Sequence, residues 1–246
     1  MNLSIVIPAY NEEMRIIPTL ERLRDDFIRN NSDTEVLVGD DGSEDGTAKF
    51  LNEFTRNNSW CRLIKRDKNR GKGAILRDLV AESKGDIVLY TDADLPVNPL
   101  DFNQLIGPIL LGKADLVQVS RWLDESPKVT NLPGYRNIIS QLFRLVILIM
   151  KPKGITDTQC GCKAINGSLA RELFPQLIID GYAFDVELLI DVQANNYSIF
   201  EIPLQVQYVE GSSVQPIHAT ITMIRDLFKI KFKFLFTKER KKLKKS

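Results

Sequence analysis

Short runs rich in apolar residues alternate with stretches of helical periodicity over the first hundred residues. The apolar runs predict buried strands at residues 3–8, 36–39, 61–65 and 87–91. Between them, apolar residues recur at helical spacing, as they do at Ile17, Leu20, Leu23 and Phe27. This alternation predicts an α/β fold with a mainly parallel central sheet flanked by helices, joined by right-handed crossovers.

The pattern is less regular beyond residue 120. A polar loop at residues 124–133 precedes an apolar helical stretch around residues 138–147, and a further strand is predicted around residues 199–208. No internal repeat and no low-complexity linker interrupts the chain. The simplest organisation is one α/β domain at residues 1–212 followed by a separate segment at residues 213–246.

Composition excludes several classes of protein. With 43% hydrophobic and 26% charged residues among 246, the chain is neither disordered nor fibrous. His218 is the only histidine and there are three cysteines, so neither a multi-histidine zinc site nor a disulfide scaffold is expected. No apolar stretch reaches the roughly 18 residues of a membrane span, and no signal peptide is expected.

The charge of the chain is unevenly distributed. Residues 225–246 contain ten basic and two acidic side chains, which leaves 23 basic and 30 acidic ones in the preceding part. An apolar stripe at helical spacing runs into this segment through Ile217, Ile221, Ile224 and Phe228. A basic segment with large apolar residues is typical of binding to a membrane surface. A solubilising tail is the alternative, and the acidic body disfavours nucleic acid.

Three of the predicted strands are followed by acidic or polar clusters. These are PAYNE at residues 8–12, DDGS at residues 40–43 and DAD at residues 92–94. Each could be a simple turn, but parallel strands would bring all three to one edge, where crowded carboxylates need a cation. Asp92 and Asp94 could both face one ion. Oxygen ligands suit Mg²⁺ or Mn²⁺, which bind through one or two carboxylates plus substrate phosphates.

A glycine-rich loop indicates that the phosphates held with this cation belong to a diphosphate. Gly71 and Gly73, with Gly42, would let backbone amides approach a diphosphate, and Arg70 and Lys72 add positive charge. The Gly-x-Gly-x-x-Gly fingerprint of dinucleotide enzymes does not follow the first strand, and the P-loop is incomplete. A diphosphate held with a divalent cation is therefore expected, outside the dehydrogenase and P-loop classes.

Several motifs, in order along the chain, resemble those of one enzyme family. The sequences IVIPAYNEE at residues 5–13, DDGS and DAD look like those of family 2 glycosyltransferases, which have the GT-A fold. Four further motifs look most like those of dolichyl-phosphate glucosyltransferases, with the dolichyl-phosphate mannose synthases as close relatives. They lie at residues 69–73, 157–161, 183–188 and 210–212.

The resemblance implies a role for each matching position. It implies a nucleotide-sugar donor, UDP-glucose or GDP-mannose, and a dolichyl or other polyprenyl phosphate as acceptor at the cytoplasmic face of a membrane. Asp92 and Asp94 would bind Mg²⁺ or Mn²⁺, with Asp94 the main ligand. The nucleotide sugar would be held by Pro8, Tyr10, Glu12, Val38, Asp40, Asp41, Lys72, Asp92, Ala93 and Asp94.

The implied reaction is an inverting hexosyl transfer. A lipid phosphate is an anion near neutral pH, because its second pKa is about 6, so it needs cations rather than a strong base. Arg121, Arg136 and Lys163 are the candidates. If the acceptor were a glycan hydroxyl, Asp185 or Glu187 would be the base, although both could simply begin a helix. A nucleotide-sugar-binding membrane adaptor is the non-enzymatic alternative.

Overall fold

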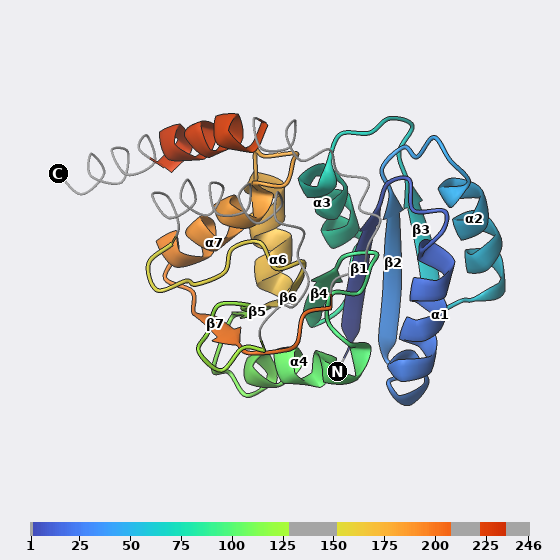
Figure 1. Cartoon of the computed structure of the whole chain (residues 1–246), viewed down its shortest axis with the longest axis horizontal. Helices are drawn as coiled ribbons and strands as arrows, with labels where there is room; N and C mark the ends of the chain where they lie inside the picture. Colours follow the sequence, from blue (N-terminus) through green and yellow to red (C-terminus); the bar gives the residue numbers. More distant parts are fainter. Residues whose placement is uncertain (1, 128–151, 208–221, 235–246) are drawn as a thin grey trace.

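The structure is a computed structural model that describes residues 2–127, 152–207 and 222–234. Its centre is a seven-stranded sheet in the order β3-β2-β1-β4-β6-β5-β7 (Figure 1). Neighbouring strands are parallel except that β6 is antiparallel to β4 and β5, so the predicted α/β fold is confirmed. The strands are β1 (Leu3–Ala9), β2 (Thr34–Asp40), β3 (Cys61–Lys65), β4 (Ile87–Thr91), β5 (Leu116–Val119), β6 (Cys162–Asn166) and β7 (Ile199–Ile202).

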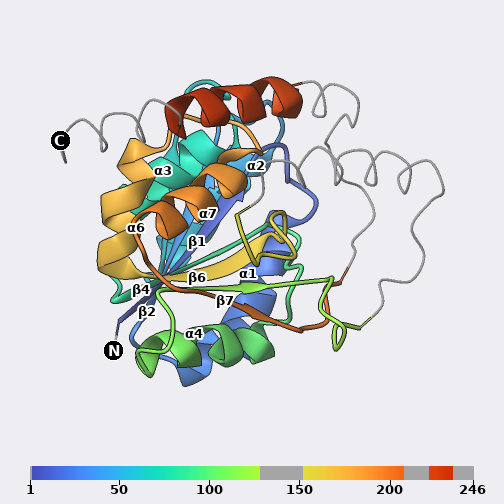
Figure 2. The same ribbon diagram turned by 90° about the vertical axis from the view of Figure 1, so that its left-hand side faces the viewer.

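Helices cover both faces of the sheet. One hydrophobic core lies under α1 and α4, and a second lies under α3, α6 and α7 (Figure 2). The helices are α1 (Ile16–Asp26), α2 (Thr47–Asn57), α3 (Lys72–Glu82), α4 (Phe102–Leu110), α6 (Gly167–Leu173) and α7 (Phe184–Ala194), with a further helix at residues 222–234. Three short 3₁₀ turns are η1 (Ile28–Asn30), η2 (Pro99–Asp101) and η3 (Phe174–Gln176).

The central strands are buried on both faces, which explains their continuous apolar runs. Ile5 and Ile7 of β1 belong to the core under α1, whereas Val6 between them belongs to the core under α3. Side chains of a strand alternate between the two faces of the sheet, so a strand covered on both sides favours apolar residues on both of its faces.

The second half of the chain differs more from prediction. The strands β5 and β6 and the helices α4 and α6 were not predicted, and β6 has the charged residue Lys163 in its interior. The predicted strand at residues 199–208 is shorter: β7 ends at Ile202, where Pro203 has no N–H to continue the ladder. The predicted helix around residues 138–147 lies outside the described residues.

The helix at residues 222–234 lies within the predicted amphipathic segment and has two apolar faces. Met223, Leu227 and Ile230 are buried in the core under α3 and α7, so this helix packs on the body of the protein. Phe228 and Phe232 remain 57% and 58% exposed. Among the described residues, no helix has the length and apolar character that a membrane crossing requires.

Candidate active site

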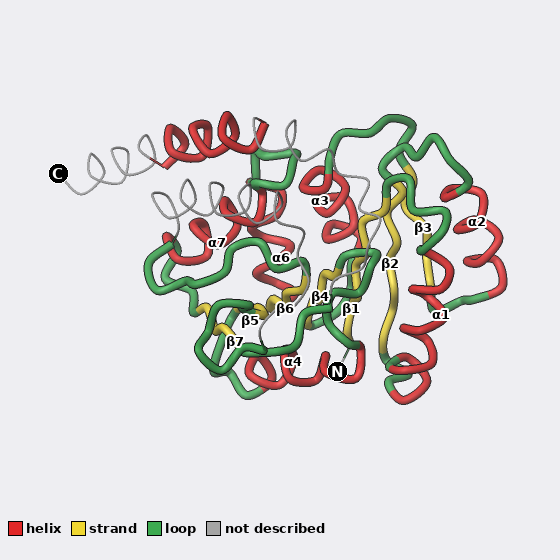
Figure 3. The backbone as a smooth tube through the Cα atoms, viewed as in Figure 1, coloured by secondary structure: helices red, strands yellow, loops and turns green. Residues whose placement is uncertain are grey.

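The loops that follow β1, β2 and β4 meet at one edge of the sheet, because these three strands are parallel (Figure 3). The Asn11 N–H donates to Ser43 Oγ at 3.0 Å, which joins the first two polar clusters. Burial raises the pKa of Glu12, and the nearby carboxylates of Asp94 and Asp92 raise this pKa further. The three predicted clusters therefore lie together.

Asp40 ends β2 and is completely buried. Its Oδ1 accepts the N–H of Ser43 at 3.1 Å. Its Oδ2 is buried and has no hydrogen-bond partner among the described residues. Burying a carboxylate oxygen without a partner is costly, so this atom is suited to accept an N–H from a bound ligand.

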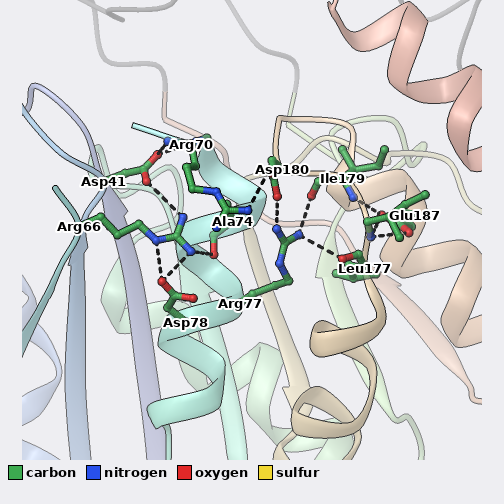
Figure 4. Close-up of polar contacts among 12 residues, drawn as sticks. Asp41, Arg66, Arg70, Ala74, Arg77, Asp78, Leu177, Ile179, Asp180 and Glu187 are labelled. Carbon is green, nitrogen blue, oxygen red and sulfur yellow. Dashed lines mark hydrogen bonds and ion pairs between the residues drawn. The ribbon is translucent and has the colours of Figure 1, made fainter. Parts of the chain in front are cut away.

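Asp41, the next residue, is directed into the protein (Figure 4). Its carboxylate accepts the N–H groups of Gly71 at 2.6 Å and Arg70 at 3.1 Å, and it pairs with Arg66 at 3.4 Å. Burial raises the pKa of Asp41, and these hydrogen bonds act in the opposite direction. In this arrangement Asp41 holds the glycine-rich loop in place, a role for which direct contact with a ligand is not needed.

The loop held by Asp41 places Lys72 at the start of α3, opposite the acidic cluster after β4. Lys72 Nζ lies 2.6 Å from Asp92 Oδ1. Burial by itself would lower the pKa of Lys72, but the charges of Asp92 and Asp185 outweigh it and raise that pKa. A Cβ added at Gly161 would collide with Asp92 Oδ2, so a glycine is needed for this carboxylate to stay beside Lys72.

Asp94 has the properties expected of a metal ligand. Its Oδ1 is buried and has no hydrogen-bond partner among the described residues. Burial raises the pKa of its carboxyl, and the charge of Asp92 raises it further. A divalent cation between the two carboxylates would relieve this repulsion.

The set of protein ligands fits Mg²⁺ or Mn²⁺ only together with a phosphate ligand. No group of three or more His, Cys, Asp or Glu arranged as a metal site is found in residues 2–127, 152–207 and 222–234. Mg²⁺ commonly binds through one or two carboxylates, substrate phosphates and water, and Asp92 and Asp94 match that mode.

Tyr182 belongs to the site but was missed in the sequence. It is 42% exposed. Burial raises the pKa of its hydroxyl group, the charge of Lys72 lowers this pKa, and the charges of Asp92 and Glu12 raise it. No pattern in the sequence distinguished Tyr182, because a loop from a distant part of the chain brings it there.

Lys163 and Asp185 form a buried ion pair beneath the site. Lys163 Nζ donates to Asp185 Oδ1 at 2.6 Å and to the Cys160 carbonyl at 2.9 Å, and the Tyr90 hydroxyl donates to the same Asp185 oxygen. Lys163 is 0% exposed and Asp185 only 3%. The structure thus places Lys163 out of reach of an acceptor phosphate, in contrast to the prediction, because it neutralises a carboxylate inside the protein.

Glu187 is also fully buried. It accepts the N–H groups of Ile178 and Ile179 at 3.0 Å each, and Lys233 Nζ at 2.7 Å. A carboxylate engaged by three donors is poorly placed to remove a proton from an acceptor. These contacts favour the structural alternative for Glu187 over the predicted general base.

Arg121 follows β5 at the same edge of the sheet as the acidic clusters. Its Nε and Nη2 donate to the two carboxylate oxygens of Asp157 at 2.6 and 2.9 Å. The side chain of Arg121 remains 30% exposed, so the pair orients the guanidinium without burying it. Arg136, its predicted companion, lies outside the described residues.

The remaining predicted residues differ in accessibility. Pro8 and Tyr10 are partly exposed at the end of β1, so their side chains can contact a ligand. Ala93 is 5% exposed, and Val38 of β2 is completely buried in the core. The Val38 side chain packs beneath the site, and its contact with the nucleotide stays a prediction.

Comparisons with known proteins agree with this arrangement. The family model described as glycosyl transferase family 2 matches residues 4–174. A dolichyl-phosphate beta-glucosyltransferase of Dictyostelium discoideum is 34% identical over 245 residues, which cover 95% of this chain and 75% of the relative. The human dolichyl-phosphate beta-glucosyltransferase is 31% identical, covering 95% of this chain and 76% of the relative.

A solved structure shows the same fold. Glucosyl-3-phosphoglycerate synthase of Mycobacterium tuberculosis, in complex with Mn²⁺, UDP and glucosyl-3-phosphoglycerate, has a TM-score of 0.67 at 24% identity. The match covers 93% of this chain and 79% of the synthase. Fold, motifs and sequence relatives together establish that the chain belongs to glycosyl transferase family 2 and is a glycosyltransferase with the GT-A fold.

Proposed function

We propose that this glycosyltransferase transfers glucose from UDP-glucose to dolichyl phosphate or a related polyprenyl phosphate, with inversion and with Mg²⁺ or Mn²⁺ as cofactor. The names of the relatives support the sugar and the acceptor. The UDP and Mn²⁺ bound by the related synthase support the nucleotide and the metal. The observation that carries the proposal is that Asp40 Oδ2 and Asp94 Oδ1, both at one edge of the sheet, are buried and have no hydrogen-bond partner among the described residues.

The donor site divides into two parts. Asp40 would accept a hydrogen bond from the nucleotide, with Pro8 and Tyr10 beside it. Asp92 and Asp94 would hold a divalent cation, which when bound acts as a Lewis acid for the departing diphosphate. Lys72 carries a positive charge next to Asp92 and would pair with the same diphosphate.

The chemistry of a phosphate acceptor agrees with the buried contacts of the two candidate bases, Asp185 and Glu187. A phosphate monoester is already largely deprotonated near neutral pH and can attack the anomeric carbon directly. Asp185 and Glu187, the candidate bases, are both engaged in buried contacts. Arg121 is a partly exposed cation at this edge that would guide the acceptor phosphate, together with Arg136 as the family resemblance implies.

A donor and acceptor panel tests this function. The purified protein with Mn²⁺ is incubated with radiolabelled UDP-glucose or GDP-mannose, and with dolichyl phosphate or an oligosaccharide. We expect glucosyl-phosphate lipid from UDP-glucose alone. Mannosyl lipid would identify a mannose synthase, a labelled glycan would identify a different acceptor, and binding without product would identify an adaptor.

Nucleotide binding should depend strongly on Asp40. The Asp40→Asn variant keeps the size of the side chain and an oxygen for the Ser43 N–H, but it loses the charge. A hydrogen bond to a charged group contributes about 1.5–3 kcal/mol, so the Kd for UDP in calorimetry should rise about 10- to 100-fold. Asp67→Asn, at an exposed position, is the control. Unchanged UDP affinity of Asp40→Asn would refute the assignment.

We also propose that the protein attaches peripherally to the cytoplasmic face of a membrane through the helix at residues 222–234, called the C-terminal helix below. Phe228 and Phe232 lie one turn apart and are both more than half exposed, next to the exposed Arg225 and Lys229. Large apolar side chains flanked by basic ones match an anionic lipid surface. Residues 235–246, which add six further basic side chains, lie outside the described part.

Liposome sedimentation tests the attachment. Burying a phenylalanine contributes about 1.5–3 kcal/mol, so the double variant Phe228→Ser/Phe232→Ser should bind phosphatidylserine vesicles at least about tenfold more weakly. Added salt should weaken binding of the parent by screening its charges. The control is Leu110→Ser/Leu111→Ser, which removes two residues that are 56% and 69% exposed at the end of α4. Equal losses in both double variants would contradict this membrane surface.

A further inference from the structure

The loop at residues 177–182, between η3 and α7, is held against the beginning of α3 (Figure 4). Arg77 of α3 donates to the carbonyls of Leu177 at 3.2 Å and Ile179 at 3.0 Å, and it pairs with Asp180. The Ala74 N–H donates to the Asp180 carbonyl at 3.1 Å. Three residues of this loop are thus joined to α3.

The loop also packs tightly on both sides of Lys72. A Cβ at Gly71 would lie 2.6 Å from the Asp180 carbonyl oxygen, and one at Gly73 would lie 2.5 Å from that of Ile179. Only glycine at these two positions allows the loop to come so close. Phe184, just after the loop, lies with its ring centroid 5.7 Å from Lys72 Nζ. The loop therefore forms the wall of the donor site beside Lys72, and it carries Tyr182.

The helix at residues 222–234 is connected to this loop through Glu187 of α7. The carboxylate of Glu187 accepts the N–H groups of Ile178 and Ile179, and Lys233 donates to Glu187 at 2.7 Å. Lys233 also donates to Asp191 at 2.9 Å and to the Gln176 carbonyl at 3.0 Å.

Lys233 supplies a positive charge beside the buried Glu187 carboxylate. Glu187 is 0% exposed, and the Lys233 side chain is 21% exposed. A buried carboxylate that loses its cation either takes up a proton or moves toward water. Either change weakens its hold on the N–H groups of residues 178 and 179.

We propose that Lys233 is a positioning residue of the donor site: through Glu187 it fixes the loop that carries Tyr182 and encloses Lys72. The C-terminal helix then has a part in donor binding besides its role at the membrane. This inference rests on the proposed function, because it takes Lys72 and Asp92 to hold the donor diphosphate.

The test compares three variants: Lys233→Met, Lys233→Arg, which keeps the charge, and Lys231→Met, which removes an exposed lysine two residues away. Assays use UDP-glucose and a short-chain lipid phosphate in detergent, so that vesicle binding does not contribute. They are run below the unfolding temperature measured for each variant. Small displacements of a site cost large factors, so we expect Lys233→Met to raise the donor KM and the Kd for UDP about tenfold. The other two variants should stay within about twofold of the parent.

A purely structural role would lower the unfolding temperature of Lys233→Met but leave the donor KM and the UDP Kd of the folded protein unchanged. That result would overturn the proposal, and so would an equal loss of UDP affinity in Lys231→Met. If Lys233→Met does not fold, Lys233→Gln, which still donates to Glu187 without a charge, should show a smaller rise in the same direction.

The calorimetric measurement separates this proposal from the proposed function. A parent protein that binds UDP but transfers no glucose contradicts the function, while the effect of Lys233→Met on UDP affinity still decides the positioning role.

The Tyr182→Ala variant tests whether Lys233 acts on the donor site through this loop. If Lys233 acts through this loop, the change in UDP binding free energy for Tyr182→Ala/Lys233→Met should be smaller than the sum for the single variants. Full additivity would contradict that route.

Discussion

The Asp94→Asn variant is expected to lose glycosyl transfer by about 10²–10³-fold, the range seen when one group that stabilises transition-state charge is removed. The substitution keeps the size of the side chain but removes one of the two charges proposed to bind Mg²⁺ or Mn²⁺. Because Asp94 Oδ1 has no partner among the described residues, no hydrogen bond of the fold depends on that oxygen. The unfolding temperature should therefore change little or rise, since the repulsion with Asp92 disappears.

Two measurements check the assignment of Asp94 independently of each other. Transfer rates are compared for the parent, Asp94→Asn and the exposed control Asp67→Asn, and UDP binding is measured by calorimetry with and without Mn²⁺. The parent and the control should bind UDP more tightly with Mn²⁺, whereas Asp94→Asn should lose most of that difference. Normal turnover of Asp94→Asn, or full parent activity in EDTA, would show that the metal site is wrongly assigned.

The largest effect on stability is expected from Lys163→Met. This change leaves the Asp185 carboxylate buried with the Tyr90 hydroxyl but without its cation. Removing one partner of a buried ion pair costs about 3–5 kcal/mol in the free energy of unfolding. For a chain of this size the unfolding temperature should fall by on the order of 10 °C, as measured by calorimetry or circular dichroism.

The double variant Lys163→Met/Asp185→Asn provides the matched comparison for this pair. It removes both charges and keeps a side-chain oxygen near Tyr90, so it should recover a large part of the lost stability. Lys84→Met, at an exposed position, is the control and should change the free energy of unfolding by less than about 0.5 kcal/mol. If Lys163→Met were as stable as Lys84→Met, the ion pair would not contribute as described.

The buried pair also bears on the position of the two proposed metal ligands. Tyr90 and Lys163 face each other across the antiparallel strands β4 and β6, and Asp92 follows Tyr90 by two residues. The Asp92 N–H donates to the Gly161 carbonyl at 3.0 Å, just before β6 begins. Two adjacent strands and one buried ion pair thus hold the backbone from which Asp92 and Asp94 project.

The sequence by itself determined the first half of the fold and the location of the proposed donor site. Strands β1, β2 and β4 were predictable because they are buried on both faces and read as compact apolar runs between helical stretches, and the half-buried edge strand β3 continues this alternation. The acidic clusters were predictable as a group because loops after parallel strands must meet at one edge. Strands β5 and β6 were not predicted, since Gln118 and Lys163 interrupt their apolar pattern.

Only the tertiary structure decided what each charged residue does. Asp40 and Asp41 are adjacent and of the same type, yet one has a buried oxygen without a partner in the described residues and the other holds the glycine-rich loop. The sequence left Glu187 as either a general base or part of a helix start. The structure shows it in a buried contact with Lys233, which is 46 residues away along the chain. A residue's burial and charged neighbours set its chemistry, and those neighbours come from distant parts of the chain, which local patterns of polar and apolar residues do not encode.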